Sequence, residues 1–325
     1  MMNSNTAAPS KILVTGASGF VGSHLVAYLM EQGHQVRVCS RQAWPTAPTD
    51  NIVVGNIHAQ TDWKAALEDI EVVIHCAARV HIMNDTAADP LSAFREVNRD
   101  ASVRLAQQAA EAGVKQLIYL SSVKVNGEMT ELGKPFTESD LPRPTDPYGI
   151  SKFEAEQALL AIGEQSSMKV TIIRPPLVYG AGVGANFLSL LGWVKKGIPL
   201  PLGAIYNRRS FVFVKNLVSF ISHCILKPAA YQQRYLISDD HDLSTTELLK
   251  AAAEAQRVPA RLLPIPASWI SGVATLVGKK SISDRLCMSL QVDISKAKNQ
   301  LQWRAPYSVA EGLRECTKLD PTPHH

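Results

Sequence analysis

The sequence has few cysteines and no cluster of metal-ligating residues. Its five cysteines are far apart, none forms a Cys-x-x-Cys pair, and no histidine stands near them at the spacing of a metal ligand. Scattered cysteines of this kind favour reduced thiols over a zinc site or a disulfide framework. We therefore predict no metal site and a cytoplasmic protein.

Long runs of charge or of apolar residues are also missing. The net charge is only +4 and basic residues do not cluster, so no nucleic acid is expected as a partner. The first ten residues are polar and do not resemble a signal peptide. The apolar stretch Trp269–Val277 is far shorter than the about 20 residues that cross a bilayer, so we expect no firm membrane insertion. It predicts a buried or subunit-facing helix; an amphipathic helix on a surface is the alternative.

What the chain does contain is an alternation of short β-branched runs and helical stretches. Strands are predicted at 11–14, 35–39, 52–54, 72–76, 116–120 and 170–173, and helices at 21–32, 62–68, 91–112 and 148–165. Strands that alternate with helices form right-handed crossovers and a parallel sheet with helices on both faces. The fold class is therefore α/β, with a doubly wound parallel sheet.

A smaller second region is predicted after Arg174-Pro175-Pro176, where the regular alternation stops. Residues 1–178 would form a dinucleotide-binding domain, and 207–237 would return to it through strands at 210–214 and 235–237. Residues 179–206 and 238–325 would form a substrate-binding region.

A glycine loop opens the first strand–helix unit. Gly16, Gly19 and Gly22 follow the strand 11–14 at the spacing of a Rossmann-type dinucleotide site. The first glycine permits a tight turn, the second lets the backbone approach a pyrophosphate, and the third lets the helix pack on its strand. The loop predicts a bound dinucleotide.

The end of the second strand indicates which dinucleotide this is. An NAD site usually has an acidic residue about 20 residues after the loop, but here the strand ends in Ser40 and Arg41, and the next acid is Asp50. Ser40 and Arg41 would suit a 2′-phosphate, which favours NADP(H) over NAD(H). The alternative is that Arg41 is a solvated residue at a strand end.

Tyr148 and Lys152 are the candidate catalytic pair. They stand four residues apart on one predicted helix, so their side chains share a face. A nearby ammonium and a cationic nicotinamide both favour phenolate, so we expect a lowered pKa for Tyr148. Ser122 follows a strand that ends at the same sheet edge, and its hydroxyl would hold a substrate oxygen while Tyr148 moves a proton.

These motifs, in this order, resemble the extended short-chain dehydrogenase/reductases of the NAD-dependent epimerase/dehydratase family. The resemblance covers nearly the whole length. It includes the glycine loop, His75-Cys76-Ala77-Ala78, Asn98, Ser122, Tyr148, Lys152, the segment 174–180 and the closing segment 301–306.

The resemblance implies roles for further residues and an assembly. Contacts to the cofactor are implied for Gly16, Ser18, Gly19, Phe20, Val21, Gly22, Ser40, Arg41, Asn56, Ile57, Ala77, Ala78, Arg79, Asn98, Tyr148, Lys152 and Pro175. Contacts to a UDP-sugar substrate are implied for Lys124, Asn126, Asn186, Arg209 and Arg285. Arginines suit a diphosphate because their fork binds two oxygens at once. A homodimer is implied, paired through the helices near 98–112 and 148–165.

The reaction is predicted from two departures from the sugar epimerases. The missing acid at Arg41 and the sequence Val125-Asn126-Gly127, where many epimerases have Val-Tyr-Gly, favour a reductase. The segments 77–81, 122–128 and 207–210 resemble bacterial reductases that form UDP-N-acetylquinovosamine. We therefore expect NAD(P)H-dependent reduction of the C4 ketone of a UDP-4-keto-6-deoxy-N-acetylhexosamine for surface polysaccharide, such as lipopolysaccharide. The alternatives are a UDP-hexose or UDP-N-acetylhexosamine 4-epimerase with bound NAD and, more remotely, a non-catalytic dinucleotide sensor.

Overall fold

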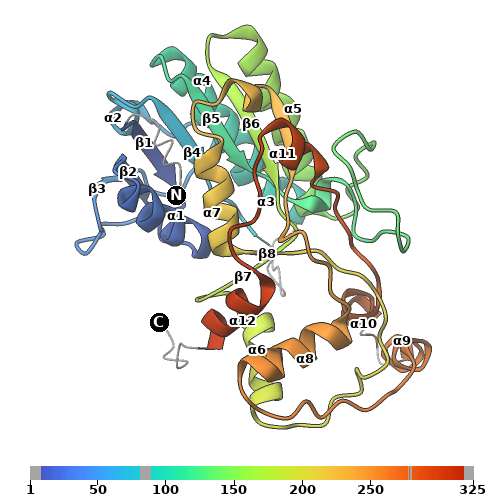
Figure 1. The fold of residues 1–325 in the computed structure, drawn as a ribbon. Coiled ribbons are helices and arrows are strands. Elements are labelled where there is room, and N and C mark those ends of the chain that lie inside the picture. The colour runs from blue at the N-terminus through green and yellow to red at the C-terminus, as the bar shows by residue number, and fades with distance from the viewer. Residues whose placement is uncertain (1–8, 81–88, 277, 279, 318–325) are drawn as a thin grey trace.

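The main sheet of the protein has seven parallel strands. The computed structural model describes residues 9–80, 89–276, 278 and 280–317 (Figure 1). The strands lie in the order β3-β2-β1-β4-β5-β6-β9, and all neighbours are parallel. Their bounds are β1 Lys11–Thr15, β2 Gln35–Ser40, β3 Asp50–Val53, β4 Val72–His75, β5 Gln116–Leu120, β6 Lys169–Arg174 and β9 Gln233–Leu236.

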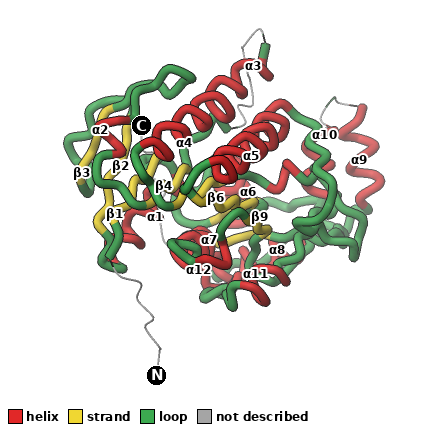
Figure 2. The backbone as a smooth tube through the Cα atoms, turned by 90° about the horizontal axis from the view of Figure 1, so that it is seen from above, coloured by secondary structure: helices red, strands yellow, loops and turns green. Residues whose placement is uncertain are grey.

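Helices cover both faces of this sheet, so its strands are apolar on both sides. On β1, Ile12 and Val14 belong to the core beneath α1 (Phe20–Glu31) and α7 (Val214–His223), whereas Leu13 belongs to the core beneath α2 (Lys64–Leu67), α4 (Ala101–Glu111) and α5 (Pro147–Gln165). Alternate side chains of a strand point to opposite faces, which explains this division. Figure 2 shows the sheet between α5 and α7.

The strand order reverses between β1 and β4, and this fixes where a ligand can bind. The chain leaves β1 towards β2 on one side, and β4 returns to the other side of β1. In open α/β sheets the crevice at such a switch point, outside the carboxyl ends of the strands, is the ligand site. The glycine loop follows β1 at this point, and residues 76–79 follow β4.

The remaining elements form a second body of structure at one end of the sheet (Figure 1). It contains a separate two-stranded sheet, β7 Leu177–Tyr179 with β8 Phe211–Phe213. Its helices are α6 Ala185–Lys195, α8 Thr245–Ala255, α9 Ala267–Leu276, α10 Lys280–Cys287 and α12 Val309–Thr317, while α11 Ser295–Gln300 packs beside β9. Leu200, Ile205 and Leu249 are among the residues of a small core of its own.

The structure confirms the α/β class with a doubly wound parallel sheet and alters two details. The helix expected over 91–112 is α3 (Pro90–Arg95) and α4 joined by a π-helical turn, Glu96–Asp100. The strand expected at 210–214 is β8, which pairs with β7 instead of returning to the main sheet, whereas β9 does join its edge. The division into 1–178 with 207–237, and 179–206 with 238–325, stays a prediction.

Two expectations about helix surfaces also change. On α4, one of the helices implied for the dimer contact, Leu105 and Ala109 are fully buried in the core of a single chain, whereas Ala112 is exposed. The apolar stretch Trp269–Val277 forms most of α9, with Val277 outside the described residues, and none of the ten described residues of this helix is buried. No described helix combines the length and the apolar character needed to cross a bilayer.

Candidate active site

The glycine loop is packed so closely that side chains are excluded at two of its positions. Gly16 has φ +69°, and a Cβ there would lie 2.6 Å from the backbone nitrogen of Ala77, in the segment after β4. A Cβ on Gly22 would lie 2.1 Å from the carbonyl oxygen of Gly16. The amide of Gly19 donates to that same oxygen at 3.0 Å and closes the turn. The loop and the segment after β4 thus form one continuous surface at the switch point.

The first turn of α1 begins at this loop with its backbone amides available. The N-cap residue is Gly19, and no side chain caps this helix. Ser18 and Gly19 are exposed, while Phe20 and Val21 are half-buried. Unpaired amides at the positive end of a helix are suited to a pyrophosphate. The geometry of the loop therefore fits a dinucleotide.

The edge beside this loop carries the residues expected to select the cofactor. Arg41 is exposed just after β2, and the hydroxyl of Ser40 donates to the carbonyl oxygen of Gln42 at 2.6 Å. The carboxylate of Asp50 does not take the place of the missing acid. It lies 2.6 Å from Nε of Arg37 and stands three residues before the end of β3. Beyond β3, Asn56 is exposed and Ile57 half-buried.

Ser122 and Tyr148 lie together at the carboxyl edge of the sheet. Ser122 follows β5 and caps the short 3₁₀ helix Val123–Val125, accepting a hydrogen bond from the amide of Lys124 at 3.2 Å. Tyr148 stands in the first turn of α5, which begins at the N-cap Asp146 with a proline in its first position. The side chains of Tyr148 and Ser122 are hydrogen-bonded to each other. A phenol and a hydroxyl in contact can hold one substrate oxygen between them.

Lys152 lies one turn further along α5 and is almost completely buried. Its ammonium donates to the hydroxyl of Tyr119 at 3.1 Å and to the carbonyl oxygen of Leu120 at 2.8 Å. It also lies 4.4 Å from the centre of the Tyr119 ring. Burial lowers the pKa of Lys152 to about 7. Partial loss of its charge near neutral pH follows from the lack of water around it.

The expected lowering of the Tyr148 pKa is absent in the protein alone. Burial raises the pKa of Tyr148 to about 12, and the hydrogen bond from Ser122 only partly opposes this. Lys152 directs its ammonium to Tyr119 and Leu120, so it does not supply the charge that would favour phenolate. A lower pKa therefore needs positive charge from a bound group.

A buried hydrogen-bond chain extends from Lys152 towards the glycine loop. The hydroxyl of Tyr119 donates to the carbonyl oxygen of Asn98 at 3.1 Å, and Ser102 donates to the same oxygen at 2.8 Å. Ser102 also contacts Nε2 of His75 at 2.8 Å, and Nδ1 of His75 lies 2.6 Å from the hydroxyl of Thr15. This chain ties six elements of the site to one another: β1, β4, β5, the π-helical turn, α4 and α5.

Sequence reasoning did not identify Thr15, Ser102 or Tyr119 as site residues. The only sequence signal was the motif His75-Cys76-Ala77-Ala78, which placed a polar residue at the end of a buried strand. Thr15, Ser102 and Tyr119 come from three other elements, and only the folded structure brings these elements next to His75.

Asn98 is fully buried within the π-helical turn. Its side-chain oxygen accepts from the amide of Arg79 at 2.8 Å, and its amide donates to the carbonyl oxygen of Arg79 at 3.0 Å and to Ser151 at 3.0 Å. A π-helical turn displaces one residue from the regular ladder and often marks a functional site. Asn98 thereby links the segment after β4 to α5.

The other residues expected at the cofactor lie around the same edge. Ala77, Ala78 and Arg79 are half-buried, and the guanidinium of Arg79 lies 5.4 Å from the centre of the Phe94 ring. Pro175 is buried after β6, and its carbonyl oxygen accepts from the amide of Val123 at 3.0 Å. His81, part of the segment 77–81, lies outside the described residues.

The five expected substrate residues are not gathered in one place. Lys124 is held by an ion pair with Asp146 and reaches Glu128 at 3.4 Å. Asn126 is 2% exposed and is bonded to Arg174 and to the carbonyl oxygen of Thr137. Its side chain therefore belongs to a buried network. Asn186 lies in the first turn of α6, where side chains are not described.

Arg209 and Arg285, by contrast, lie near each other. Burial lowers the pKa of Arg209, and the positive charge of Arg285 lowers it further. Arg209 donates to the carbonyl oxygen of Met288 at 2.9 Å, and Arg285 is exposed on α10. Two neighbouring guanidinium groups repel each other unless an anion lies between or beside them, and this favours a diphosphate.

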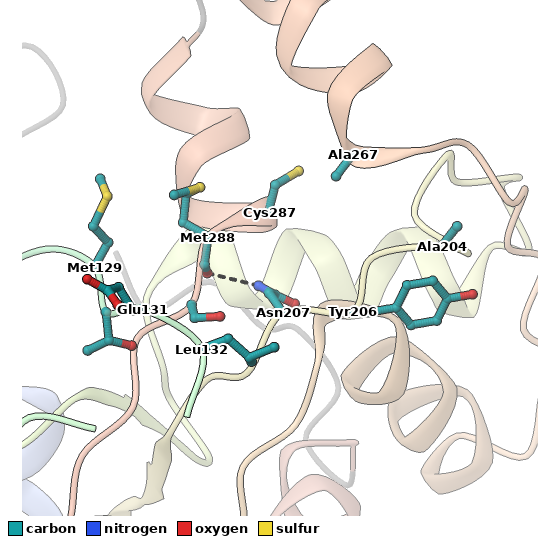
Figure 3. A pocket seen from close by; sticks show the side chains of 11 residues that line it. Met129, Glu131, Leu132, Ala204, Tyr206, Asn207, Ala267, Cys287 and Met288 are labelled. Carbon is teal, nitrogen blue, oxygen red and sulfur yellow. Dashed lines mark hydrogen bonds between the residues drawn. The ribbon is translucent and has the colours of Figure 1, made fainter. Parts of the chain in front are cut away.

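An open cleft of about 680 Å³ is lined in part by Met288, whose carbonyl oxygen accepts from Arg209. Figure 3 shows its lining, in which the side-chain amide of Asn207 donates to the carbonyl oxygen of Met288. Residues 129–132 form one wall, and Ala267 and Cys287, from α9 and α10, form another. Ser122, Tyr148 and Lys152 are not among the residues that line the cleft, and neither are Arg209 and Arg285.

Comparison with known proteins places the chain in a family. The sequence profile of the NAD dependent epimerase/dehydratase family matches residues 12–238. The chain belongs to this family. It is 46% identical, over 95% of both chains, to a UDP-glucose 4-epimerase of Vibrio cholerae. It is 27% identical, over 93% of its own length and 92% of the relative's, to an N-acetyl-α-D-glucosaminyl-diphospho-ditrans,octacis-undecaprenol 4-epimerase of Escherichia coli O157:H7.

A solved structure confirms the fold independently. The UDP-N-acetylglucosamine 4-epimerase of Bacillus cereus superimposes with a TM-score of 0.77, covering 95% of this chain and 98% of that one, at 21% sequence identity. At this identity the likeness concerns the fold alone. The chain is thus an enzyme of the NAD-dependent epimerase/dehydratase family. It has the Rossmann-type fold of an extended short-chain dehydrogenase/reductase.

These findings correct the predicted reaction. The relative that matches at 46% identity over nearly full length is a 4-epimerase, which contradicts the predicted 4-ketoreductase and supports the alternative. The two sequence differences that favoured a reductase, at Arg41 and Asn126, do not distinguish the two reactions in the structure. Arg41 is a solvent-exposed residue at a strand end, and Asn126 is buried among structural partners. The family is NAD-dependent, and nothing in the comparisons favours NADP(H) over NAD(H).

Proposed function

We propose that the chain is a UDP-hexose 4-epimerase that keeps NAD bound during turnover. The observation that carries this proposal is the 46% identity, over 95% of both chains, to a UDP-glucose 4-epimerase, in a chain that retains Ser122, Tyr148 and Lys152. A non-catalytic sensor would have no need for this trio.

The residues act in a simple sequence in this proposal. Ser122 and Tyr148 hold the 4-hydroxyl of the sugar, and Tyr148 takes its proton while C4 is oxidised. The nicotinamide, held by the glycine loop and residues 77–79, would supply reversible hydride transfer at C4. Tyr148 would return the proton to the 4-oxygen and so complete the inversion at C4. Lys152 and Asn98 position the groups around this centre through the buried hydrogen-bond chain.

The loop Gly16–Gly22, with Ser18, Phe20 and Val21, would hold the pyrophosphate, and Ala77, Ala78, Arg79 and Pro175 would line the cofactor. We propose NAD as the resident cofactor because the family is NAD-dependent. The exposed Arg41 beside Ser40 gives a specific reason to test NADP as well. Asn56 and Ile57 complete the edge of this part of the site.

The substrate side is proposed to include the second region, 179–206 with 238–325, and Arg209 from the adjoining segment 207–237. Arg209 and Arg285 would bind the diphosphate of the UDP group, and the cleft beside them would receive the rest of the substrate. Asn186 and Lys124 remain candidates for sugar contacts. A homodimer through α4 and α5 remains a proposal as well.

One relative suggests a second substrate class. The Escherichia coli epimerase named above acts, by its name, on an N-acetylhexosamine linked through a diphosphate to undecaprenol. Paired arginines recognise a diphosphate whether it is attached to uridine or to a lipid. The lipid-linked sugar is therefore included in the test.

The test is to incubate the purified protein with UDP-glucose, without added cofactor, and to follow inversion at C4 by proton NMR. We expect UDP-galactose to form and NAD to be released on denaturation. Tyr148→Phe should retain the dinucleotide and lose activity by about 10²–10⁴-fold. Parallel reactions with UDP-N-acetylglucosamine and the lipid-linked sugar define the substrate. Dinucleotide-loaded protein that inverts none of these sugars would overturn the proposal.

A further inference from the structure

Helices α9 and α10 present an apolar surface to solvent. Trp269, Val273 and Leu276 lie one and two turns apart on α9, with exposed fractions of 70%, 61% and 88%. Ile282 on α10 is 51% exposed. We call these four residues the α9–α10 face. Residues at this spacing form one stripe of a helix, so the exposure is a property of a continuous surface.

An apolar groove runs between the two helices and enlarges this face. It has a volume of about 450 Å³ and is lined by apolar side chains with one serine. Three residues of the face, Trp269, Val273 and Ile282, line it together with Ile270, Ala274 and Leu286. Soluble monomers rarely expose a continuous apolar patch, and one surrounded by polar residues marks an interaction site. The length of α9, about 15 Å at 1.5 Å per residue, is too short to cross a bilayer.

The charge around the face identifies the kind of partner. Between residues 256 and 288 the sequence has five Lys or Arg and one acid, Asp284. This segment therefore carries +4, which equals the net charge of the whole chain. Among its described residues, Arg257, Arg261, Lys280 and Arg285 are exposed. Exposed basic residues in the same segment as an apolar stripe complement a surface that is both negatively charged and apolar below its charges.

This charge argues against a second copy of the chain as the occupant. Two such faces in contact would bring two +4 segments together, and like charges desolvated at an interface repel. An exposed tryptophan in an apolar stripe is instead a feature of the boundary between lipid chains and headgroups. An amphipathic helix on a surface is the alternative that the sequence predicts for the stretch Trp269–Val277, and the exposed stripe of α9 agrees with that alternative.

We propose that the α9–α10 face docks on the surface of an anionic lipid bilayer, with α9 lying in the plane of the headgroups. Ala267 at the start of α9 and Cys287 at the end of α10 also line the open cleft beside Arg209. Docking therefore places the mouth of this cleft next to the headgroups. The proposal does not depend on which sugar is epimerised.

The test is sedimentation of the full-length protein with vesicles. We expect binding to vesicles of phosphatidylglycerol and phosphatidylethanolamine, at least tenfold weaker binding to phosphatidylcholine, and release by 0.5 M NaCl because salt screens the charges. The double variant Val273→Asp and Leu276→Asp should lose at least tenfold in affinity for the anionic vesicles. Lys280→Glu should weaken the same binding without altering the apolar stripe.

The matched control is Leu141→Asp, which places the same charge on a leucine that is 77% exposed outside the face. It should bind vesicles as the unmodified protein does. Turnover of a water-soluble UDP-sugar and the thermal unfolding curve should be unchanged in all variants, which shows that they are folded. Three results would overturn the proposal: no binding to anionic vesicles, equal loss in Leu141→Asp, or a change in oligomeric mass in the double variant, which would assign the face to a second copy.

Discussion

The ammonium of Lys152 donates a hydrogen bond to the hydroxyl of Tyr119 at 3.1 Å and lies 4.4 Å from the centre of the same ring. The hydroxyl and the ring both favour the charged form of the lysine, whereas burial opposes it and lowers its pKa to about 7. Tyr119 is therefore a positioning residue that acts on the reaction through Lys152.

Replacing Tyr119 with Phe should shift the pH dependence of the enzyme. The variant keeps the ring but removes an acceptor, so the pKa of Lys152 should fall further below 7. We expect about a tenfold fall in kcat with little change in KM, because one hydrogen bond to a charged group is lost. The pH–rate profile of the loaded enzyme measures the shift. Tyr235→Phe, another buried tyrosine, is the control, and an unmoved inflection in Tyr119→Phe would contradict this role.

Lys152 should also make the free protein more stable as the pH rises. Its pKa is about 7 in the folded state and about 10.4 in the unfolded chain, so between these values the unfolded state binds more protons. Stability from this residue therefore increases from about pH 7 to pH 10, by up to about 1.4 kcal/mol per pH unit. Comparison with Lys152→Met by urea unfolding isolates the effect. If both proteins show the same pH slope, the lysine is not buried as described.

Arg209 should contribute to substrate binding more than to turnover. Arg209→Ala removes one of two neighbouring guanidinium groups beside the cleft, so we expect KM for a UDP-sugar to rise by about 10–100-fold, equivalent to about 1.4–2.8 kcal/mol. Steady-state kinetics measures KM and kcat separately. Arg208→Ala is the control, since this exposed neighbour reaches Glu247 at 3.4 Å. A fall in kcat with an unchanged KM would contradict a role for Arg209 in substrate binding.

The buried pair Arg174 and Glu156 should be essential for stability. Two hydrogen bonds, at 2.9 and 2.5 Å, join side chains that are 1% and 0% exposed. Glu156→Gln leaves the guanidinium without a compensating charge, and we expect a loss of about 3–5 kcal/mol in the free energy of unfolding. Lys134→Ala, which breaks an exposed pair with Glu131, should change it by less than about 1 kcal/mol. Urea unfolding of both variants tests this contrast.

Local sequence patterns predicted the strands and the catalytic trio because each depends on neighbours in the chain. The apolar runs gave six strands of the main sheet nearly to the residue, and the spacing of Tyr148 and Lys152 placed them on one helix. The residues that support Lys152 could not be predicted. Tyr119, Ser102 and Thr15 come from three elements, and only the register of the sheet and the π-helical turn brings them together.

Long-range contacts also explain what local patterns did not indicate. The resemblance implied a substrate contact for Asn126, and its side chain is hydrogen-bonded to Arg174, 48 residues away in the chain. The direction of the Tyr148 pKa depends on burial, which no spacing rule contains. The reaction itself was misjudged because an exposed arginine at a strand end carries no information about whether hydride returns to the sugar.

The hydrogen bonds of His75 keep this histidine from titrating near neutral pH at the edge where the cofactor would bind. Both ring nitrogens are engaged, by Thr15 and Ser102, and burial lowers the pKa of His75 to about 3. The imidazole therefore stays neutral throughout the pH range in which the enzyme is assayed. Among the described residues of this edge, an inflection near pH 7 in the pH–rate profile should therefore trace to Lys152 and not to His75. Changes of pH near neutrality would then reach the reaction through a lysine, although a histidine lies at the same edge.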